Sequence, residues 1–474
     1  MRWSKTMSIS ASVLALCLLT TDAPTQVAPI QVPSDFDAKA TEYLKARATA
    51  RGFNGVVLIA LNGQPIVRRA FGMASRDFGV PNAVGTKFRI GSVTKQFTAA
   101  AILRLEQEGK LKLTDKVSAH LSDWPRPWDA MTIHHLLSHT GGFPALKFDV
   151  QSNVSGLTSP SWQPRFTKFS DYLAPGEERL EPDFVPGESW MYSNIGYVAL
   201  GLIVEKVSGL PYSDFLAQRF FTPLGMAHTG CEEPQTIIPG GATGYALKAG
   251  VYEHVPFVDM RIPGGAGQIY STIDDMLLWN NALAANKVLS KAETAKLFTP
   301  VQNGYGYGWW INKRFGRGET WHRGNVNGFV AINSRYSNEG LSIIVLSNVE
   351  RTPVRAMANE LAAIAFGQPY EIPVELKQAA IRVSSFDAYL GSYTKESDPS
   401  DHVSLVRNAD ELALDLPLYN ASLRLVPMAR DWLFSPGSPL EFQIRIVNDK
   451  AGKFSHLLIS NEGETSKWLK APGS

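Results

Sequence analysis

The stretch that decides the fold reads Phe88-Arg-Ile-Gly-Ser-Val-Thr-Lys95, and it opens a long helical pattern that runs to about Glu108. Apolar residues recur there at helical spacing, and Gly109 follows as a stop signal. On a helix, residues three apart share one face, so Ser92 and Lys95 lie together at the positive N-terminal end. A serine hydroxyl becomes a good nucleophile when a neighbouring base takes its proton. The sequence therefore predicts a nucleophilic Ser92 activated by Lys95.

A second pair with the same spacing, Ser392-Tyr-Thr-Lys395, shows that spacing alone is not enough. A serine and a lysine three residues apart arise by chance about once or twice in a chain of this length. This copy lies in strand-like sequence, where neighbours two apart share a face and residues three apart do not. We therefore expect Ser392 to have no catalytic role.

The second candidate motif is Tyr192-Ser-Asn194. It follows Pro186-Gly-Glu188 and precedes a helical pattern, a turn position from which side chains reach a site. A tyrosine phenol positioned by an amide is suited to relay protons between nucleophile, base and leaving group. We therefore predict catalytic roles for Tyr192 and Asn194. The same tripeptide recurs as Tyr336-Ser-Asn338, where a hairpin turn between two strands explains it.

The third candidate motif begins at His322-Arg-Gly324, in a strand that we expect at the edge of the site. Glycine at position 324 lets a substrate backbone approach closely. The N–H of Asn325 is the expected second donor of an oxyanion hole, beside the N–H of the nucleophile. We predict that His322 is catalytic and that Arg323, Gly324 and Asn325 bind substrate.

These motifs resemble the β-lactamase-related serine hydrolases, a family of class C β-lactamases, penicillin-binding D-alanyl-D-alanine peptidases, D-aminopeptidases and certain esterases. The resemblance spans about Asp37 to Gly367 and includes His135-Leu-Leu-Ser-His-Thr-Gly-Gly142 and Gly264-Gly-Ala-Gly267. It implies an α/β fold, with an antiparallel sheet flanked by helices and an all-helical region. Class C β-lactamases carry Lys-Thr-Gly where this chain has His322-Arg-Gly324, which points away from a dedicated β-lactamase.

Two functions follow from the resemblance. The first is a serine hydrolase that forms a covalent acyl-enzyme on an ester or amide, of carboxylesterase or D-amino-acid peptidase type, with weak β-lactamase activity at most. The alternative is a penicillin-binding or sensor-like protein that is acylated but turns over very slowly. The sequence favours turnover, because a sensor is expected to carry a span or a signalling domain. We expect the rate to fall below neutral pH as Lys95, Tyr192 or His322 takes up a proton.

We expect a small-molecule or short-peptide substrate and no nucleic acid, because 46 Lys and Arg against 44 Asp and Glu leave a net charge of only +2. His135 and His139 are spaced to bind zinc from one helix face, but Leu136 occupies the glutamate position of the metalloprotease form. A helix ended by glycines accounts for His139-Thr-Gly141. We therefore expect no metal and no cofactor. The sequence does not indicate how many copies of the chain assemble.

Residues 1–30 are expected to be a signal peptide and leader. Arg2 and Lys5 precede an apolar run from about Ile9 to Leu19, which is the layout of an export signal. Export to the periplasm or the medium follows, with no stable membrane span after signal removal. Lipid anchoring at Cys17 is not expected, because Leu16 stands where such sites need a small residue.

The rest of the chain is predicted to hold two domains. Residues 31–367 form the hydrolase domain, and residues 368–385, with two prolines and no clear period, form a linker. From residue 386 to 474, short alternating runs separated by turn signals predict a small all-β barrel. This last domain resembles the lipocalin-like domain that some family members carry.

Overall fold

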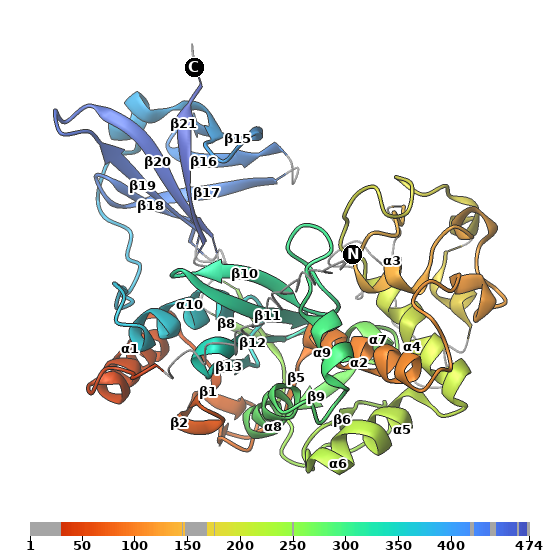
Figure 1. Ribbon diagram of the computed structural model, residues 1–474. Coiled ribbons are helices and arrows are strands. Elements are labelled where there is room, and N and C mark those ends of the chain that lie inside the picture. The colour runs from red at the N-terminus through yellow and green to blue at the C-terminus, as the bar shows by residue number, and fades with distance from the viewer. Residues whose placement is uncertain are drawn as a thin grey trace, which may run out of the picture.

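The computed structural model describes residues 30–144, 146, 168–174, 176–248, 251–417, 421–436, 442–461 and 464–471. An α/β body carries a β-barrel, joined to it through residues 368–379, which have no regular structure (Figure 1). Apart from residue 30, the expected leader lies outside these ranges. Within them, no helix has both the length and the apolar character that a membrane crossing needs.

The α/β body is built on an antiparallel sheet in the order β10-β11-β12-β13-β1-β2. Asn62 and Gly63 join the first two strands and both have positive φ, +51° and +77°, as a tight hairpin turn requires. This first hairpin and the strands near the end of the body meet in one sheet, since β1 pairs with β13. The strands are β1 (Gly55–Leu61), β2 (Gln64–Phe71), β10 (Trp310–Arg314), β11 (Arg317–Val326), β12 (Phe329–Tyr336) and β13 (Leu341–Ser347).

Strand β1 shows why the sheet is covered on both faces. Its residues Val56 and Leu58 pack into the core shared with the helical region, whereas Val57 and Ile59 pack into the core beneath α1 and α10. Alternate side chains of a strand point to opposite faces, and all four are fully buried. Burial of each such side chain stabilises the fold by roughly 1.5–3 kcal/mol.

Helices lie on both sides of this sheet (Figure 1). Helices α1 (Phe36–Arg51) and α10 (Val354–Ala365) cover one face, and α2 (Thr94–Gln107), α4 (Asn194–Ser208) and α8 (Ile273–Ala284) contribute to the core on the other. The remaining α-helices are α3 (Ile133–Leu137), α5 (Tyr212–Leu216), α6 (Thr222–Leu224), α7 (Gly264–Gly267) and α9 (Lys291–Leu297). The remaining strands of the body are β3 (Met73–Ser75), β4 (Val80–Pro81), β5 (Phe88–Arg89), β6 (Gly230–Cys231), β7 (Tyr245–Lys248), β8 (Val251–His254) and β9 (Ile269–Ser271).

The C-terminal strands close into an antiparallel barrel with a core of its own. They are β14 (Gly391–Lys395), β15 (Asp398–Asn408), β16 (Glu411–Leu416), β17 (Ala421–Ala429), β18 (Trp432–Phe434), β19 (Gln443–Asn448), β20 (Phe454–Asn461) and β21 (Glu464–Lys470). The barrel closes because β14 also pairs with β21, which leaves no sheet edge there. The fold class expected from the sequence, an α/β body followed by a small β-barrel, is confirmed.

One detail of the expected secondary structure differs. The sequence pattern places the start of the long helix at Ser92, but the α-helix begins at Thr94. Ser92 lies in the 3-10 turn Gly91–Val93 that leads into it. The short repeat of such a turn still brings residues three apart to one side, so the expected proximity of Ser92 and Lys95 survives.

Candidate active site

Ser92 is held at the start of α2 by the strand before it. Strand β5 pairs with β9, and the N–H of Ile90 donates to the Ile269 carbonyl at 3.0 Å. Ser92 is partly exposed, whereas Lys95 in the first turn of α2 is fully buried. The serine hydroxyl thus lies at the boundary between solvent and core.

The amino group of Lys95 contacts three separate segments of the chain. Its Nζ lies 3.0 Å from Ser92 Oγ, 2.8 Å from Asn194 Oδ1 and 3.2 Å from the Ala266 carbonyl oxygen. Amide and carbonyl oxygens only accept, so the amine donates to Asn194 and Ala266. In the contact with Ser92, either the amine or the hydroxyl can be the hydrogen-bond donor. When the amine is neutral, the serine hydroxyl donates to it, which is the arrangement that a general base requires.

Tyr192 and Asn194 reach this amine because Ser193 caps the helix that follows. The Ser193 side chain accepts the N–H of Gly196 at 3.2 Å, which satisfies a donor in the first turn of α4. Its neighbours on either side then reach the same site: Asn194 accepts from Lys95, and the Tyr192 ring centroid lies 4.8 Å from Lys95 Nζ. The predicted pair is brought together with Ser92 and Lys95.

Strand β11 lies directly against the turn that carries Ser92. A Cβ at Gly324 would lie 1.8 Å from the Ile90 carbonyl oxygen and 2.9 Å from the Ser92 nitrogen. A Cβ at Gly91 would lie 2.8 Å from the Asn325 nitrogen. Both approaches require glycine. They bring the segments that carry the Ser92 and Asn325 backbone nitrogens close together, which the predicted oxyanion hole requires.

This part of β11 is also open on one side. Pairing of β10 with β11 ends at Trp310 and Trp321, while β12 remains paired as far as Val326. Within the described ranges, the backbone from His322 onward therefore has a strand on one edge only. Arg323 is partly exposed and Asn325 is exposed, so the expected substrate-binding residues lie at an accessible strand edge.

His322 is buried near Lys95, and its imidazole is neutral. A carbonyl oxygen only accepts, so Nδ1 donates to Arg323 O at 2.6 Å, and Nε2 accepts from the Tyr305 hydroxyl at 3.0 Å. Burial and the nearby Lys95 charge lower the pKa of His322 to about 3, against the opposing effect of its bond to the Arg323 carbonyl. Of the three groups that the sequence leaves open for proton uptake below neutral pH, His322 is therefore excluded.

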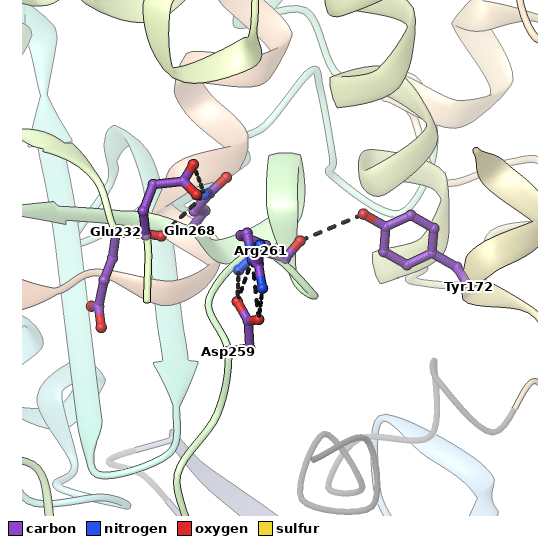
Figure 2. Close-up of polar contacts among 6 residues, drawn as sticks. Tyr172, Glu232, Asp259, Arg261 and Gln268 are labelled. Carbon is purple, nitrogen blue, oxygen red and sulfur yellow. Dashed lines mark hydrogen bonds and ion pairs between the residues drawn. The ribbon is translucent and has the colours of Figure 1, made fainter. Parts of the chain in front are cut away.

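The segment that supplies the Ala266 carbonyl is fixed by polar contacts on both sides of it. Arg261 donates from Nε and Nη2 to the carboxylate of Asp259, and the Tyr172 hydroxyl donates to the Arg261 carbonyl at 3.5 Å (Figure 2). On the other side, Gln268 Nε2 donates to the Glu232 carbonyl at 3.1 Å. A cavity of about 30 Å³ lined by Tyr172, Arg261 and Gln268 lies here, room for about one or two water molecules and too small for a substrate.

The second copies of the Ser-x-x-Lys and Tyr-Ser-Asn motifs lie away from the site, as the sequence predicts. Ser392 is in strand β14 of the barrel and contacts Ser404, while Lys395 pairs with Asp401 at 3.4 Å. Tyr336 is buried at the end of β12, before the turn to β13. Neither motif lies with Ser92.

Sequence reasoning did not assign two groups to the site that the structure places there, the Ala266 carbonyl and the His139 side chain. The Ala266 carbonyl is a backbone group, and only the Gly264-Gly-Ala-Gly267 run marked its segment. His139 lies after the end of α3, so it shares no helix face with His135, and its ring centroid lies 4.4 Å from that of Tyr192. No group of three or more His, Cys, Asp or Glu that fits a metal ion occurs in the described part of the chain.

Comparison with known proteins agrees with this geometry. The Beta-lactamase family model matches residues 36–366. Penicillin-binding protein 4* of Bacillus subtilis (strain 168) is 30% identical over 428 residues, which cover 85% of this chain and 92% of that protein. The chain therefore belongs to the Beta-lactamase family, whose chemistry is that of serine hydrolases acylated at the nucleophile.

Solved structures extend the comparison to the fold. The octameric penicillin-binding protein homologue from Pyrococcus abyssi superposes with a TM-score of 0.64 over 91% of this chain and 99% of that one, at 23% identity. The D-amino acid amidase from Ochrobactrum anthropi SV3, complexed with L-phenylalanine, has a TM-score of 0.57 at 25% identity, over 66% of this chain and 92% of that one. The first comparison covers the barrel as well as the α/β body.

The neutral, buried state of His322 predicts a pH-dependent stability. The unfolded chain takes up a proton near pH 6.5, whereas the folded protein takes it up only near pH 3, so stability falls as pH decreases across this window. His322→Gln should reduce the slope of unfolding free energy against pH by up to about 1.4 kcal/mol per pH unit. Urea unfolding at several pH values measures it.

His402→Gln provides the control, because His402 is an exposed histidine of the barrel. That variant should keep the wild-type slope. An unchanged slope in His322→Gln would show that the imidazole is not held neutral.

Proposed function

We propose that this chain is an exported serine hydrolase that forms an acyl-enzyme at Ser92 and hydrolyses small esters or amides, including amides of D-residues. The observation that supports it most is the 3.0 Å contact between Lys95 Nζ and Ser92 Oγ, with the same amine held by Asn194. This contact supplies what a serine needs to attack a carbonyl, a base within hydrogen-bond reach.

The reaction runs in two halves. Ser92 Oγ attacks the substrate carbonyl carbon and its proton passes to Lys95, while the N–H groups of Ser92 and Asn325 receive the oxyanion. The tetrahedral intermediate collapses, the bond to the leaving group breaks, and the leaving group takes a proton relayed by Lys95 and Tyr192. Water then attacks the acyl carbon, gives one proton back to the same groups, and the bond to Oγ breaks. Ser92 regains its proton and the acid product leaves.

The neutral state of His322 supports an uncharged substrate. Class C β-lactamases resemble this chain but carry lysine at the first position of the third motif, which places a positive charge there. His322, with a pKa lowered to about 3 by burial and the Lys95 charge, supplies none near neutral pH. A β-lactam carboxylate therefore loses a favourable electrostatic contact, which for two charges about 4 Å apart is about 1 kcal/mol in bulk water and about 4 kcal/mol near a protein surface. Esters and simple amides lose nothing by the change.

A second candidate is supported by the B. subtilis relative, which is named a penicillin-binding protein. In that case the chain would be acylated at Ser92 but would release the product very slowly. The two candidates share acylation and differ in deacylation, so multiple turnover separates them. For either, we propose export, a small-molecule or short-peptide ligand, and no nucleic acid partner.

The two Ser-x-x-Lys motifs give the proposal a matched control. Ser92→Ala should abolish covalent labelling by a serine-directed phosphonate, because the nucleophile acts as a unit with its base. Ser392→Ala should leave labelling intact, since Ser392 lies on a barrel strand. Intact mass spectrometry and peptide mapping should find one adduct per chain, at Ser92. Labelling that survives Ser92→Ala and disappears with Ser392→Ala would overturn the assignment.

Substrate preference is measured with a short chromogenic ester, a D-residue amide and a chromogenic cephalosporin in parallel. We expect many turnovers per labelled site on the ester or the amide, and slower turnover of the cephalosporin. Cephalosporin turnover above that of every ester and amide would refute the preference. A single burst equal to the number of sites, with no steady state on any of the three, would support the slow-releasing alternative instead.

A further inference from the structure

His139 has a backbone conformation that side chains rarely adopt. It follows the last turn of α3 with φ at +60°, a left-handed conformation that is uncommon for residues other than glycine. Its side chain is 1% exposed. Such conformations persist where the surroundings determine them, and they cluster at functional sites. The expectation that glycines end this helix is wrong: the C-cap is Ser138, and His139 itself takes the left-handed position after it, where glycine is usual.

His139 forms hydrogen bonds to the residues immediately before and after Tyr192. The N–H of Met191 donates to the His139 carbonyl at 2.9 Å, and the N–H of Ser193 donates to His139 Nδ1 at 3.1 Å. Between these two bonds, the imidazole lies against the Tyr192 ring with centroids 4.4 Å apart. One residue therefore fixes the backbone before Tyr192, the backbone after it and one face of its ring.

We propose that His139 is a positioning residue, which holds the Tyr192 phenol and the Asn194 amide at the Lys95 amine by clamping the backbone around Tyr192. This inference rests on the proposed function for its effect on rate, but not for its effect on structure. Asn194 is included because its neighbour Ser193, the cap of α4, is the residue whose N–H the imidazole accepts.

The clamp requires a neutral imidazole. Nδ1 can accept the Ser193 N–H only when it carries no proton, so the ring proton lies on Nε2. That nitrogen is buried with no hydrogen-bond partner among the described residues, surrounded by the rings of Tyr192, Tyr197 and Tyr305. Burial, followed by the charge of Lys95, lowers the pKa of His139 well below its usual value. Nδ1 of His139 therefore stays available as an acceptor near neutral pH.

Two substitutions separate the clamp from the backbone strain. His139→Gly adopts positive φ without strain but has no acceptor and no ring. His139→Asn also tolerates the left-handed conformation, and its Oδ1 stands as many bonds from Cα as Nδ1 does. The asparagine variant therefore keeps the bond to the Ser193 N–H, while the glycine variant loses it.

We expect His139→Gly to lower the phosphonylation rate of Ser92 and kcat on the ester on the order of 100-fold, with KM little changed, because misplaced catalytic groups lose rate rather than affinity. His139→Asn should recover most of that loss. In a crystal structure of His139→Gly, the Tyr192 ring should be displaced from Lys95, whereas in His139→Asn it should keep its wild-type place.

The matched control is His135→Ala. His135 Nδ1 accepts a backbone N–H in the same way, but from Thr132 at 3.2 Å, at the start of α3 and not next to Tyr192 in the chain. This variant should lower thermal stability without lowering the rate per folded molecule. A His139→Gly variant that keeps Tyr192 in place and the wild-type rate per folded molecule would overturn the inference. Failure of the wild-type protein to be labelled at Ser92 would overturn the proposed function instead, and the position of Tyr192 would still decide the clamp.

Discussion

The fully buried amino group of Lys95 is the contact on which the site depends. A lysine amine taken out of water is stable only where polar partners replace the water that it loses. Here Ser92, Asn194 and the Ala266 carbonyl lie around it, and they come from the start of α2, the start of α4 and the α7 turn. One amine therefore lies where three segments of the chain meet, and it connects Ser92 with residues about 100 and 170 positions further along the sequence.

Strand β11 completes this arrangement from the sheet. At one end, Gly324 lets the strand approach the Ser92 turn to a distance that no Cβ would allow. At the other end, Glu319 forms a buried pair with Arg355 of α10, with nitrogen and oxygen 2.6 Å apart. Breaking such a buried pair by removing one partner is strongly destabilising, by about 3–5 kcal/mol. The helix on the far face of the sheet thus fixes the strand that carries Asn325, the proposed second oxyanion donor.

Local signals in the sequence were enough to predict the fold class and the contact between Ser92 and Lys95. The three-residue spacing at a helix start predicts the contact of Ser92 with Lys95, the Asn62-Gly63 turn predicts the first hairpin, and alternating runs predict the barrel. The sequence does not reveal that the Ala266 carbonyl accepts from the amine, because every residue type carries the same backbone carbonyl. Nor does it give the protonation of His322 or the clamp by His139, since both depend on burial and on neighbours distant along the chain.

Replacement of Lys95 by methionine tests the central claim most directly. Methionine fills similar space without an amine, so the segments around position 95 stay packed while Ser92 loses its base. We predict that Lys95→Met unfolds cooperatively like the wild-type protein, but that the rate of Ser92 phosphonylation falls on the order of 10²- to 10⁴-fold, the usual contribution of general base catalysis. A folded Lys95→Met protein that is phosphonylated at Ser92 at the wild-type rate would contradict the account.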